Sequence, residues 1–242
     1  MEKNNSLKFR RVVLKISGEA LKGEGEVFNQ NVFDHVASEI EDAHRLGAQL
    51  GVVVGGGNIL RGEELTRLGL DRNRSDYSGM IATIINALVL QSYLHLKGID
   101  AEVQSGLEIP ALIEPVDLRK TFSYLDSGKV VIFAAGTGRP YFTTDTAATL
   151  RACEIGADAV LKATKVDGVY DKDPEKFRDA KLFQEVSYND VLKYRLNVMD
   201  MTAISMCREN NIPIVVFNLF RKGSLAGILK GEKIGTLVKG VE

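Results

Sequence analysis

The sequence predicts an α/β protein built on a mostly parallel central sheet with helices on both faces. Apolar stretches rich in Val and Ile alternate along the chain with stretches of helical period, a pattern typical of strands joined by crossover helices. Since polar residues do not alternate within the apolar stretches, we expect both faces of most strands to be buried. The 242 residues suit one large domain or two small ones. Because no linker, repeat or low-complexity run interrupts the chain, we predict a single domain.

The first half of the chain is expected to hold four strands and three helices. Gly47 and Gly98 follow the first two helices, where a glycine is common just beyond a helix C-terminus. The second helix is apolar nearly all round, which indicates burial in the core or against another subunit. In chain order the predicted elements are strand 11–16, helix 29–46, strand 52–54, helix 76–97, strand 101–104, helix 117–125 and strand 129–134.

The second half is expected to hold three strands and four short helices. Gly156 ends the first of these helices, and Ser187 is a typical N-cap residue for the second. The predicted elements are helix 145–155, strand 159–162, a helix from 187 to 194, helix 202–209, strand 214–217, a helical turn 224–229 and strand 235–238.

Composition excludes several classes of protein. The net charge of −1 argues against a broad electrostatic surface for nucleic acid, although it leaves room for a local basic pocket. Residues 1–9 are polar, unlike a signal peptide, and no run reaches the roughly eighteen apolar residues of a membrane span. Cys153 and Cys207 match no metal-ligand spacing and are expected in the core. We therefore expect a cytoplasmic protein that binds neither membranes nor nucleic acid.

The stretch from Leu50 to Gly62 is the first candidate site. Val52, Val53 and Val54 predict a buried strand, and three consecutive glycines follow it. Such a run exposes backbone N–H groups and lets a ligand approach closely. Asn58 is expected to cap a helix whose N-terminus favours anions, with Arg61 one turn inside it. The stretch therefore predicts a phosphate-binding loop.

Other polar residues also follow predicted strands, where ligands bind in parallel sheets. Lys15 near the end of strand 11–16 is either an edge lysine that reaches water or a cation for phosphoryl oxygens. The loop 135–145 could be a simple helix cap at its threonines, but it has more polar groups than one cap needs. In the loop 162–174, Asp167 and Gly168 fit a turn, while the Tyr170 ring could stack on a purine.

Two aspartates precede or begin predicted helices and each fits two roles. Asp76 at the head of helix 76–97 is either an N-cap or an acceptor for ribose hydroxyls. Asp200, before helix 202–209, could cap that helix, or it could orient Lys15.

Several catalytic chemistries have little support in the sequence. A Walker P-loop and a Gly-x-Gly-x-x-Gly motif cannot be found, and His35, His44 and His95 fall on predicted helices away from the loops. A cluster typical of covalent or zinc catalysis is missing as well. Glycine loops combined with Lys, Arg, Thr and Asp remain, and these residue types suit phosphoryl transfer by positioning and electrostatics.

Four motifs together resemble the bacterial UMP kinase (uridylate kinase) family of the amino acid kinase superfamily, over about residues 10–238. They are LKISGEA at 14–20, VGGGNILR at 54–61, GTGRPYFTTD at 136–145 and LKATKVDGVY at 161–170. The first and fourth occur loosely across the superfamily, whereas the third is specific to uridylate kinases. The resemblance implies a three-layer α/β/α fold with an eight-stranded sheet.

The resemblance also implies an activity. Such enzymes transfer the γ-phosphate of ATP to UMP, giving UDP and ADP in pyrimidine nucleotide biosynthesis, with Mg²⁺ carried by ATP. They form homohexamers built from dimers, are inhibited by UTP and are often activated by GTP. On this basis residues 10–145 are expected to serve mainly UMP and residues 146–238 mainly ATP, after a flexible 1–9.

Carried over residue by residue, the resemblance assigns four groups. The catalytic residues are expected to be Lys15, Arg61 and Asp200. ATP is expected to bind Lys15, Ile16, Ser17, Gly18, Gly57, Arg61, Thr164, Tyr170 and Asp173. UMP is expected to bind Gly56, Asp76, Thr137, Gly138, Arg139, Pro140, Tyr141, Phe142, Thr143 and Thr144. The segment tied to GTP is Gly23, Glu24, Gly25, Glu26, Val27 and Phe28, more acidic than is usual for that role.

Two alternatives stay open at the level of sequence. The chain could be another kinase of the same fold that phosphorylates a carboxylate or carbamate, such as aspartate, glutamate or acetylglutamate. It could also be a non-catalytic nucleotide-binding protein, although the presence of both Lys15 and Arg61 argues against that.

Overall fold

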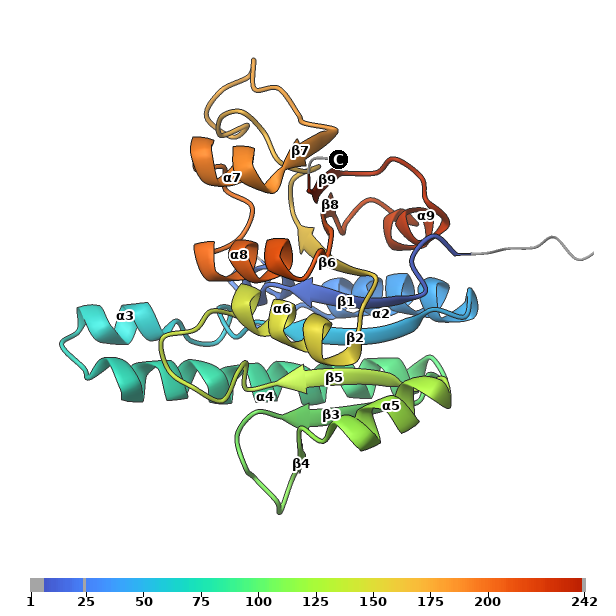
Figure 1. The fold of residues 1–242 in the computed structure, drawn as a ribbon. Coiled ribbons are helices and arrows are strands. Elements are labelled where there is room, and N and C mark those ends of the chain that lie inside the picture. Colours follow the sequence, from blue (N-terminus) through green and yellow to red (C-terminus); the bar gives the residue numbers. More distant parts are fainter. Residues whose placement is uncertain (1–6, 24, 241–242) are drawn as a thin grey trace, which may run out of the picture.

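The protein is organised around one nine-stranded sheet with the strand order β4-β3-β5-β2-β1-β6-β8-β9-β7 (Figure 1). The computed structural model describes residues 7–23 and 25–240. Neighbouring strands run parallel except for β8 and β9. The α/β class and the mostly parallel sheet are therefore confirmed, with nine strands where eight were expected.

The elements lie close to their predicted positions. The strands are β1 (Arg11–Ile16), β2 (Gln49–Val54), β3 (Ala101–Ser105), β4 (Glu114–Pro115), β5 (Val130–Ala134), β6 (Ala159–Thr164), β7 (Glu185–Ser187), β8 (Ile214–Asn218) and β9 (Thr236–Lys239). The helices are α1 (Gly18–Leu21), α2 (Gln30–Arg45), α3 (Gly62–Arg67), α4 (Arg72–Leu96), α5 (Leu118–Asp126), α6 (Thr144–Ile155), α7 (Tyr188–Tyr194), α8 (Met201–Glu209) and α9 (Ser224–Lys230). The short elements α1, β4 and β7 had not been predicted, and α3 begins at Gly62, later than the helix expected directly after Asn58.

Helices cover both faces of the sheet and make three layers. One hydrophobic core joins the sheet to α2, α4 and α9, and a second joins it to α5, α6, α7 and α8. Cys207 is buried in the second core and Cys153 packs against it, as predicted. Figure 1 shows α6 and α8 in front of the sheet, with α2 and α4 behind it.

Strand periodicity decides which residues of β1 meet which layer. Val12, Leu14 and Ile16 enter the core shared with α2 and α4, whereas Val13 enters the core shared with α6. Lys15 alternates with Leu14 and Ile16, so its side chain leaves the sheet toward α6.

The order of the strands also positions the site. The chain forms β2, β3 and β5 on one side of β1 and then returns to place β6 on its other side. Such a reversal in a parallel sheet opens a crevice at the carboxyl ends of the strands. The loops after β1, β2, β5 and β6 meet at that edge.

Helix α4 begins earlier than predicted. Asp71 caps it by accepting a hydrogen bond from the Arg74 N–H, so Asp76 lies inside the helix and its predicted capping role is wrong. Of the described helices, α4 alone has the length and mean hydropathy of a membrane span. Core helices pass the same test, and α4 packs against β3 and β5.

Candidate active site

The glycine loop after β2 is held by close backbone contacts. A Cβ at Gly18 would lie 2.7 Å from Asn58 Oδ1, and one at Gly55 would lie 2.7 Å from the Gly18 nitrogen. A Cβ at Gly56 would lie 2.9 Å from the Gly79 carbonyl oxygen of α4. Because real Cβ atoms do not approach this closely, these glycines let the β1–α1 turn, the loop and α4 pack directly together. A Cβ at Gly57 would lie 3.6 Å from Arg61 Nε and 3.7 Å from the Glu19 side chain, which are ordinary contact distances, so this position has room for a small side chain.

Asn58 does not cap a helix, contrary to the prediction. It lies in a turn closed by hydrogen bonds from the Ile59 and Leu60 N–H groups to the Gly56 carbonyl. Its side chain bonds Asn86 of α4, whose amide donates to the Gly55 carbonyl at 2.7 Å. Asn86 is fully buried and therefore ties the loop to α4.

Replacing Asn86 with alanine should lower the free energy of unfolding by about 1–3 kcal/mol, because it leaves the Gly55 carbonyl without its buried donor. Denaturant unfolding measures the change. Asn210→Ala serves as the control, since Asn210 is exposed and its side chain donates to the Met206 carbonyl of its own helix. The control should stay within about 0.5 kcal/mol of the parent, and equal losses in both variants would contradict the role given to Asn86.

Two lysines lie side by side at the carboxyl ends of neighbouring strands. Lys15 and Lys162 are register partners on β1 and β6, so both side chains leave the same face of the sheet. Asp145, in the first turn of α6, lies against both of them. Its Oδ1 is 2.9 Å from Lys15 Nζ, and its Oδ2 accepts from Lys162 Nζ at 3.0 Å. Asp145 therefore carries one negative charge against two ammonium groups, and the charge of Asp200 also acts on Lys162.

The ionisation of Asp145 follows from this arrangement. Burial alone would raise its pKa, but the ammonium groups of Lys15 and Lys162 outweigh burial and hold the pKa below its ordinary value. Burial lowers the pKa of Lys162 against the opposing attraction of Asp145, and the nearby charge of Lys15 lowers it further. Asp145 is therefore a carboxylate at neutral pH and serves as a counter-ion.

Asp200 connects α8 to the loop that follows β5. Its side chain caps α8 by accepting from the Ala203 N–H at 2.9 Å, so its capping role is confirmed. It also accepts from the Thr146 hydroxyl at 2.7 Å and from the Thr143 hydroxyl. The alternative that Asp200 orients Lys15 is wrong, because the ion pair of Lys15 is with Asp145.

Arg61 occupies the N-cap position of α3 and not a position one turn inside a helix, as had been predicted. Its Nη2 lies 2.9 Å from Glu19 Oε1 across the mouth of the glycine loop. Partial burial would raise the pKa of Glu19, but the hydrogen bond from Lys22 and the charge of Arg61 lower it below the ordinary value. A carboxylate thus holds the guanidinium beside Gly57.

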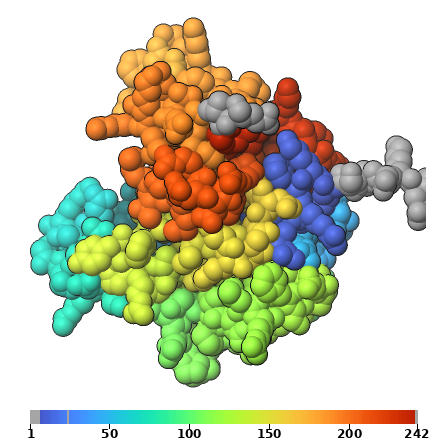
Figure 2. Space-filling model, in the orientation of Figure 1, coloured from blue at the N-terminus to red at the C-terminus, as the bar shows by residue number. Residues whose placement is uncertain are grey.

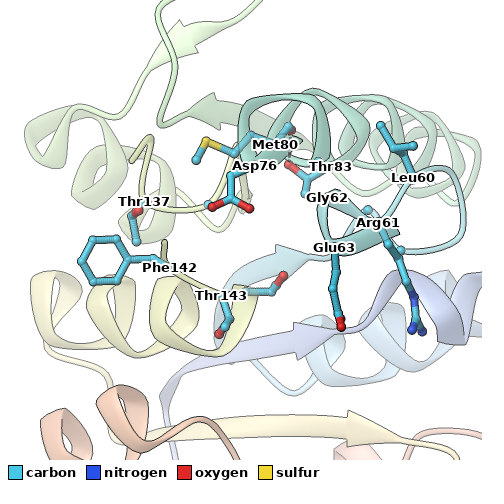
Figure 3. Close-up of a pocket in the computed structure, with 15 residues that line it drawn as sticks. Leu60, Arg61, Gly62, Glu63, Asp76, Met80, Thr83, Thr137, Phe142 and Thr143 are labelled. Carbon is cyan, nitrogen blue, oxygen red and sulfur yellow. Dashed lines mark hydrogen bonds between the residues drawn. The ribbon is translucent and has the colours of Figure 1, made fainter. Parts of the chain in front are cut away.

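A cavity of about 360 Å³ opens between the glycine loop, the N-terminal half of α4 and the segment that precedes α6 (Figure 3). Figure 2 shows the region of α3, in cyan, standing out beside the yellow-green segment that follows β5. Eight predicted site residues line the cavity: Gly56, Gly57, Arg61, Asp76, Thr137, Phe142, Thr143 and Thr144. The structure therefore brings most of the predicted acceptor residues together.

Sequence reasoning missed part of this lining. The missed residues are Leu60, Gly62, Glu63, Gly79, Met80 and Thr83, while Gly136 had been named only as part of the polar loop 135–145. Gly79, Met80 and Thr83 follow Asp76 at helical spacing, so they share its face of α4. Thr83 also accepts the Ala135 N–H at 2.7 Å, fixing a residue whose φ of 58° is left-handed.

Two of the predicted acceptor residues, Thr137 and Gly138, also shape the loop that follows β5. The Thr137 hydroxyl accepts from the Arg139 N–H at 3.2 Å. Gly138 has a φ of 72°, and a Cβ there would lie 2.8 Å from the carbonyl carbon of Gly106. The loop therefore turns tightly against the segment that follows β3.

The residues predicted to bind the nucleoside of ATP lie apart from this cavity. The Thr164 hydroxyl donates to the Val166 carbonyl at 2.7 Å, and Tyr170 forms a bridge with Leu182. Asp173 accepts from the Glu175 N–H at 3.0 Å. All three belong to the region from β6 to β7, which rises above the sheet in Figure 1.

The segment predicted to respond to GTP touches the glycine loop. Glu24 lies outside the described residues. The Val27 carbonyl accepts from the Asn58 side chain at 2.9 Å, while the Phe28 ring lies 6.0 Å from that of Phe33. Glu26 accepts from the Asn29 side chain at 3.1 Å. The segment therefore contacts the loop through Asn58.

A parallel sheet with cations and glycine loops at its carboxyl edge defines a phosphate-binding α/β protein. The model of the Amino acid kinase family matches residues 10–218, and the chain belongs to that family. The chain is 52% identical over 231 residues to the uridylate kinase of Magnetococcus marinus, covering 95% of this chain and 96% of that protein.

Two solved structures are similar over nearly the whole chain. The UMP kinase of Bacillus anthracis has a TM-score of 0.93 and 38% identity, with 97% of each chain covered. The UMP kinase of Ureaplasma parvum has a TM-score of 0.89 and 36% identity, covering 95% of this chain and 98% of that one.

Proposed function

We propose that this protein is a UMP kinase, which transfers the γ-phosphate of ATP to UMP and releases UDP and ADP. The supporting observation is the cavity bounded by Gly56, Arg61, Asp76 and the 137–144 segment, which adjoins the Lys15–Asp145–Lys162 cluster. The high identity to a uridylate kinase over 95% of the chain supports the same activity.

The proposed catalysis is electrostatic. Two anionic nucleotides must meet at the transfer point, and Lys15 and Arg61 supply positive charge there. The acceptor is an ionised phosphate, so the reaction needs no strong general base. Asp145 keeps Lys15 in place, and Asp200 holds Thr143 and Thr146 at the start of α6. Asp200 thus contributes by positioning.

Mg²⁺ is expected to arrive with ATP. Residues 7–23 and 25–240 contain no group of three or more His, Cys, Asp or Glu side chains that could hold a metal ion. Mg²⁺ in kinase sites is bound largely by phosphate oxygens and water, with few protein ligands. When bound, the ion would neutralise charge on the ATP phosphates, while the chain supplies Lys15 and Arg61.

The activity is tested by measuring ADP release from ATP in the presence of each candidate acceptor in turn. We expect turnover with UMP, weaker turnover with CMP, and none with aspartate, glutamate or acetylglutamate. An active amino acid with inert UMP would favour the carboxylate kinase alternative. ATP binding without turnover would favour a non-catalytic protein. A structure with UMP should place its phosphate near Gly56 and Arg61 and its uracil against residues 137–144.

The assembly is proposed to be a homohexamer built from dimers. Tyr77, Ile81 and Ile85 form an exposed apolar stripe on α4, at a spacing that places them on one helix face. Such a stripe marks a protein interaction surface. Light scattering measures the mass in solution, and a monomeric mass would contradict this proposal.

Regulation and location complete the proposal. We expect cytoplasmic function in pyrimidine nucleotide biosynthesis, inhibition by UTP, and activation by GTP acting through residues 23–28. Assays with each nucleotide added separately test the regulation, and unchanged rates would contradict it. Residues 10–145 are expected to serve mainly UMP and residues 146–238 mainly ATP.

A further inference from the structure

The first residue of α4 is an arginine, which local helix energetics does not favour. A cation at a helix N-terminus opposes the helix dipole. Arg72 also precedes its partner Asp76 by four residues, the less favourable orientation for such a pair. The placement of Arg72 therefore needs an explanation outside helix stability.

The contacts of Arg72 supply that explanation. Its Nε donates to both carboxylate oxygens of Asp76, at 2.9 and 2.8 Å. Asp76 Oδ2 also accepts the Tyr141 N–H at 2.8 Å, across 65 residues of sequence. The Arg72 guanidinium carbon lies 5.5 Å from the centre of the Tyr141 ring. One carboxylate, one guanidinium and one aromatic ring thus join α4 to the loop that follows β5.

The loop needs such support at this point. Tyr141 has a φ of 72°, a left-handed conformation that is strained for a bulky residue. Its side chain is 64% exposed, so packing alone does not hold it. The next residue, Phe142, lines the cavity together with Asp76, and Figure 3 shows both beside it. The hydrogen bond from Tyr141 to Asp76 therefore fixes where Phe142 lies.

We propose that Arg72 is a positioning residue for the acceptor nucleotide. It orients the Asp76 carboxylate and clamps Tyr141 onto α4, so that Asp76 and Phe142 face the cavity before the nucleotide arrives. This inference rests on the proposed function. Arg72 is not among the described residues that line the cavity, and its side chain is half exposed. It therefore acts through Asp76 and Tyr141.

A clamp of this kind has a specific kinetic signature. Without the clamp, part of the binding energy of the acceptor must be used to order the loop. The apparent affinity for the acceptor is then reduced in proportion to the fraction of molecules whose loop is already correctly placed. The hydrogen bonds and the ion pair described for Arg72, Asp76 and Tyr141 join residues of the acceptor side, so KM for ATP should be unaffected. A merely structural role would lower stability and impair both substrates alike.

The experiment measures KM for UMP, KM for ATP and kcat in Arg72→Ala, Arg72→Lys and Arg45→Ala. We expect Arg72→Ala to raise KM for UMP about tenfold, the loss of a charge-assisted hydrogen bond, with the other two constants within about twofold. Arg72→Lys should restore part of the affinity, since lysine keeps the charge but not the planar group. Arg45 is the matched control because it forms an i,i+4 ion pair with Glu41 on α2.

A second readout does not depend on activity. The Tyr141 amide should exchange with solvent deuterium faster in Arg72→Ala than in the parent, while amides of β5 stay unchanged. An unchanged KM for UMP, or equal rises for UMP and ATP, would overturn the inference. A parent protein that fails to phosphorylate UMP would instead overturn the proposed function, and the exchange of Tyr141 would still report on the clamp.

Discussion

Replacing Lys15 with methionine is expected to lower kcat for UMP phosphorylation by about 10²–10³-fold, the loss typical of removing one group that stabilises transition-state charge. Methionine has a similar length and suits a position that is only 7% exposed. The fold should survive, because Asp145 and Lys162 remain as a matched pair. The loss should therefore be catalytic.

Steady-state kinetics and thermal unfolding of the same preparation separate the two effects. Lys230→Met is the control, since Lys230 is exposed at the end of α9 and belongs to no predicted site. We expect the control to keep kcat within about twofold of the parent. A Lys15→Met protein that is folded and fully active would show that Lys15 does not stabilise the transferred phosphoryl group.

Replacing Asp145 with asparagine should have the largest effect on stability. The change leaves the buried Lys15 and the partly buried Lys162 side by side without their shared carboxylate. Breaking a buried ion pair by removing one partner costs about 3–5 kcal/mol. Urea unfolding measures this loss. The control is Asp179→Asn, whose exposed side chain pairs with Lys172, and it should change stability by less than about 1 kcal/mol. Similar losses in both variants would contradict the role of Asp145.

The same variant tests the pKa of Asp145. Because that pKa is lower in the folded protein, the unfolded chain binds the proton more readily, and the contribution of Asp145 is fully present above its ordinary pKa. The contribution is lost as the pH falls through the lowered value. The difference in stability between parent and Asp145→Asn should therefore shrink in strong acid. A difference that is constant with pH would mean that Asp145 is not ionised in the folded parent.

Strand positions were predictable from the sequence because hydrophobic pattern determines them locally. β1, β5 and β8 lie within a residue or two of their predicted bounds. The missed strands β4 and β7 have two and three residues, too short for a pattern to form. The start of helix α3 was wrong because none of its residues is buried, so it has no apolar stripe that would mark its bounds.

The candidate site was predictable in its members but not in its pairings. Glycines and hydroxyl side chains after predicted strands indicated the ligand-binding loops. Asp76 and Thr143, both predicted to bind UMP, line the same cavity. The partner of Lys15 was wrong because it depends on the register of β1 with β6, which only the folded sheet defines. The start of α4 was wrong because Asp71 and Asp76 are both typical N-cap residues. In the structure Asp71 caps the helix, while Asp76 accepts hydrogen bonds from Arg72 and Tyr141.

The glycine contacts around the loop have a consequence for directed evolution. Gly18, Gly55 and Gly56 each face another backbone within 3 Å of where a Cβ would stand, so libraries randomised at these positions would yield mostly unfolded clones. A Cβ at Gly57 would meet Arg61 and Glu19 only at ordinary contact distance, so this position has room for alanine. Selection for altered nucleotide preference should therefore leave the first three unchanged and explore Gly57 together with the cavity side of α4.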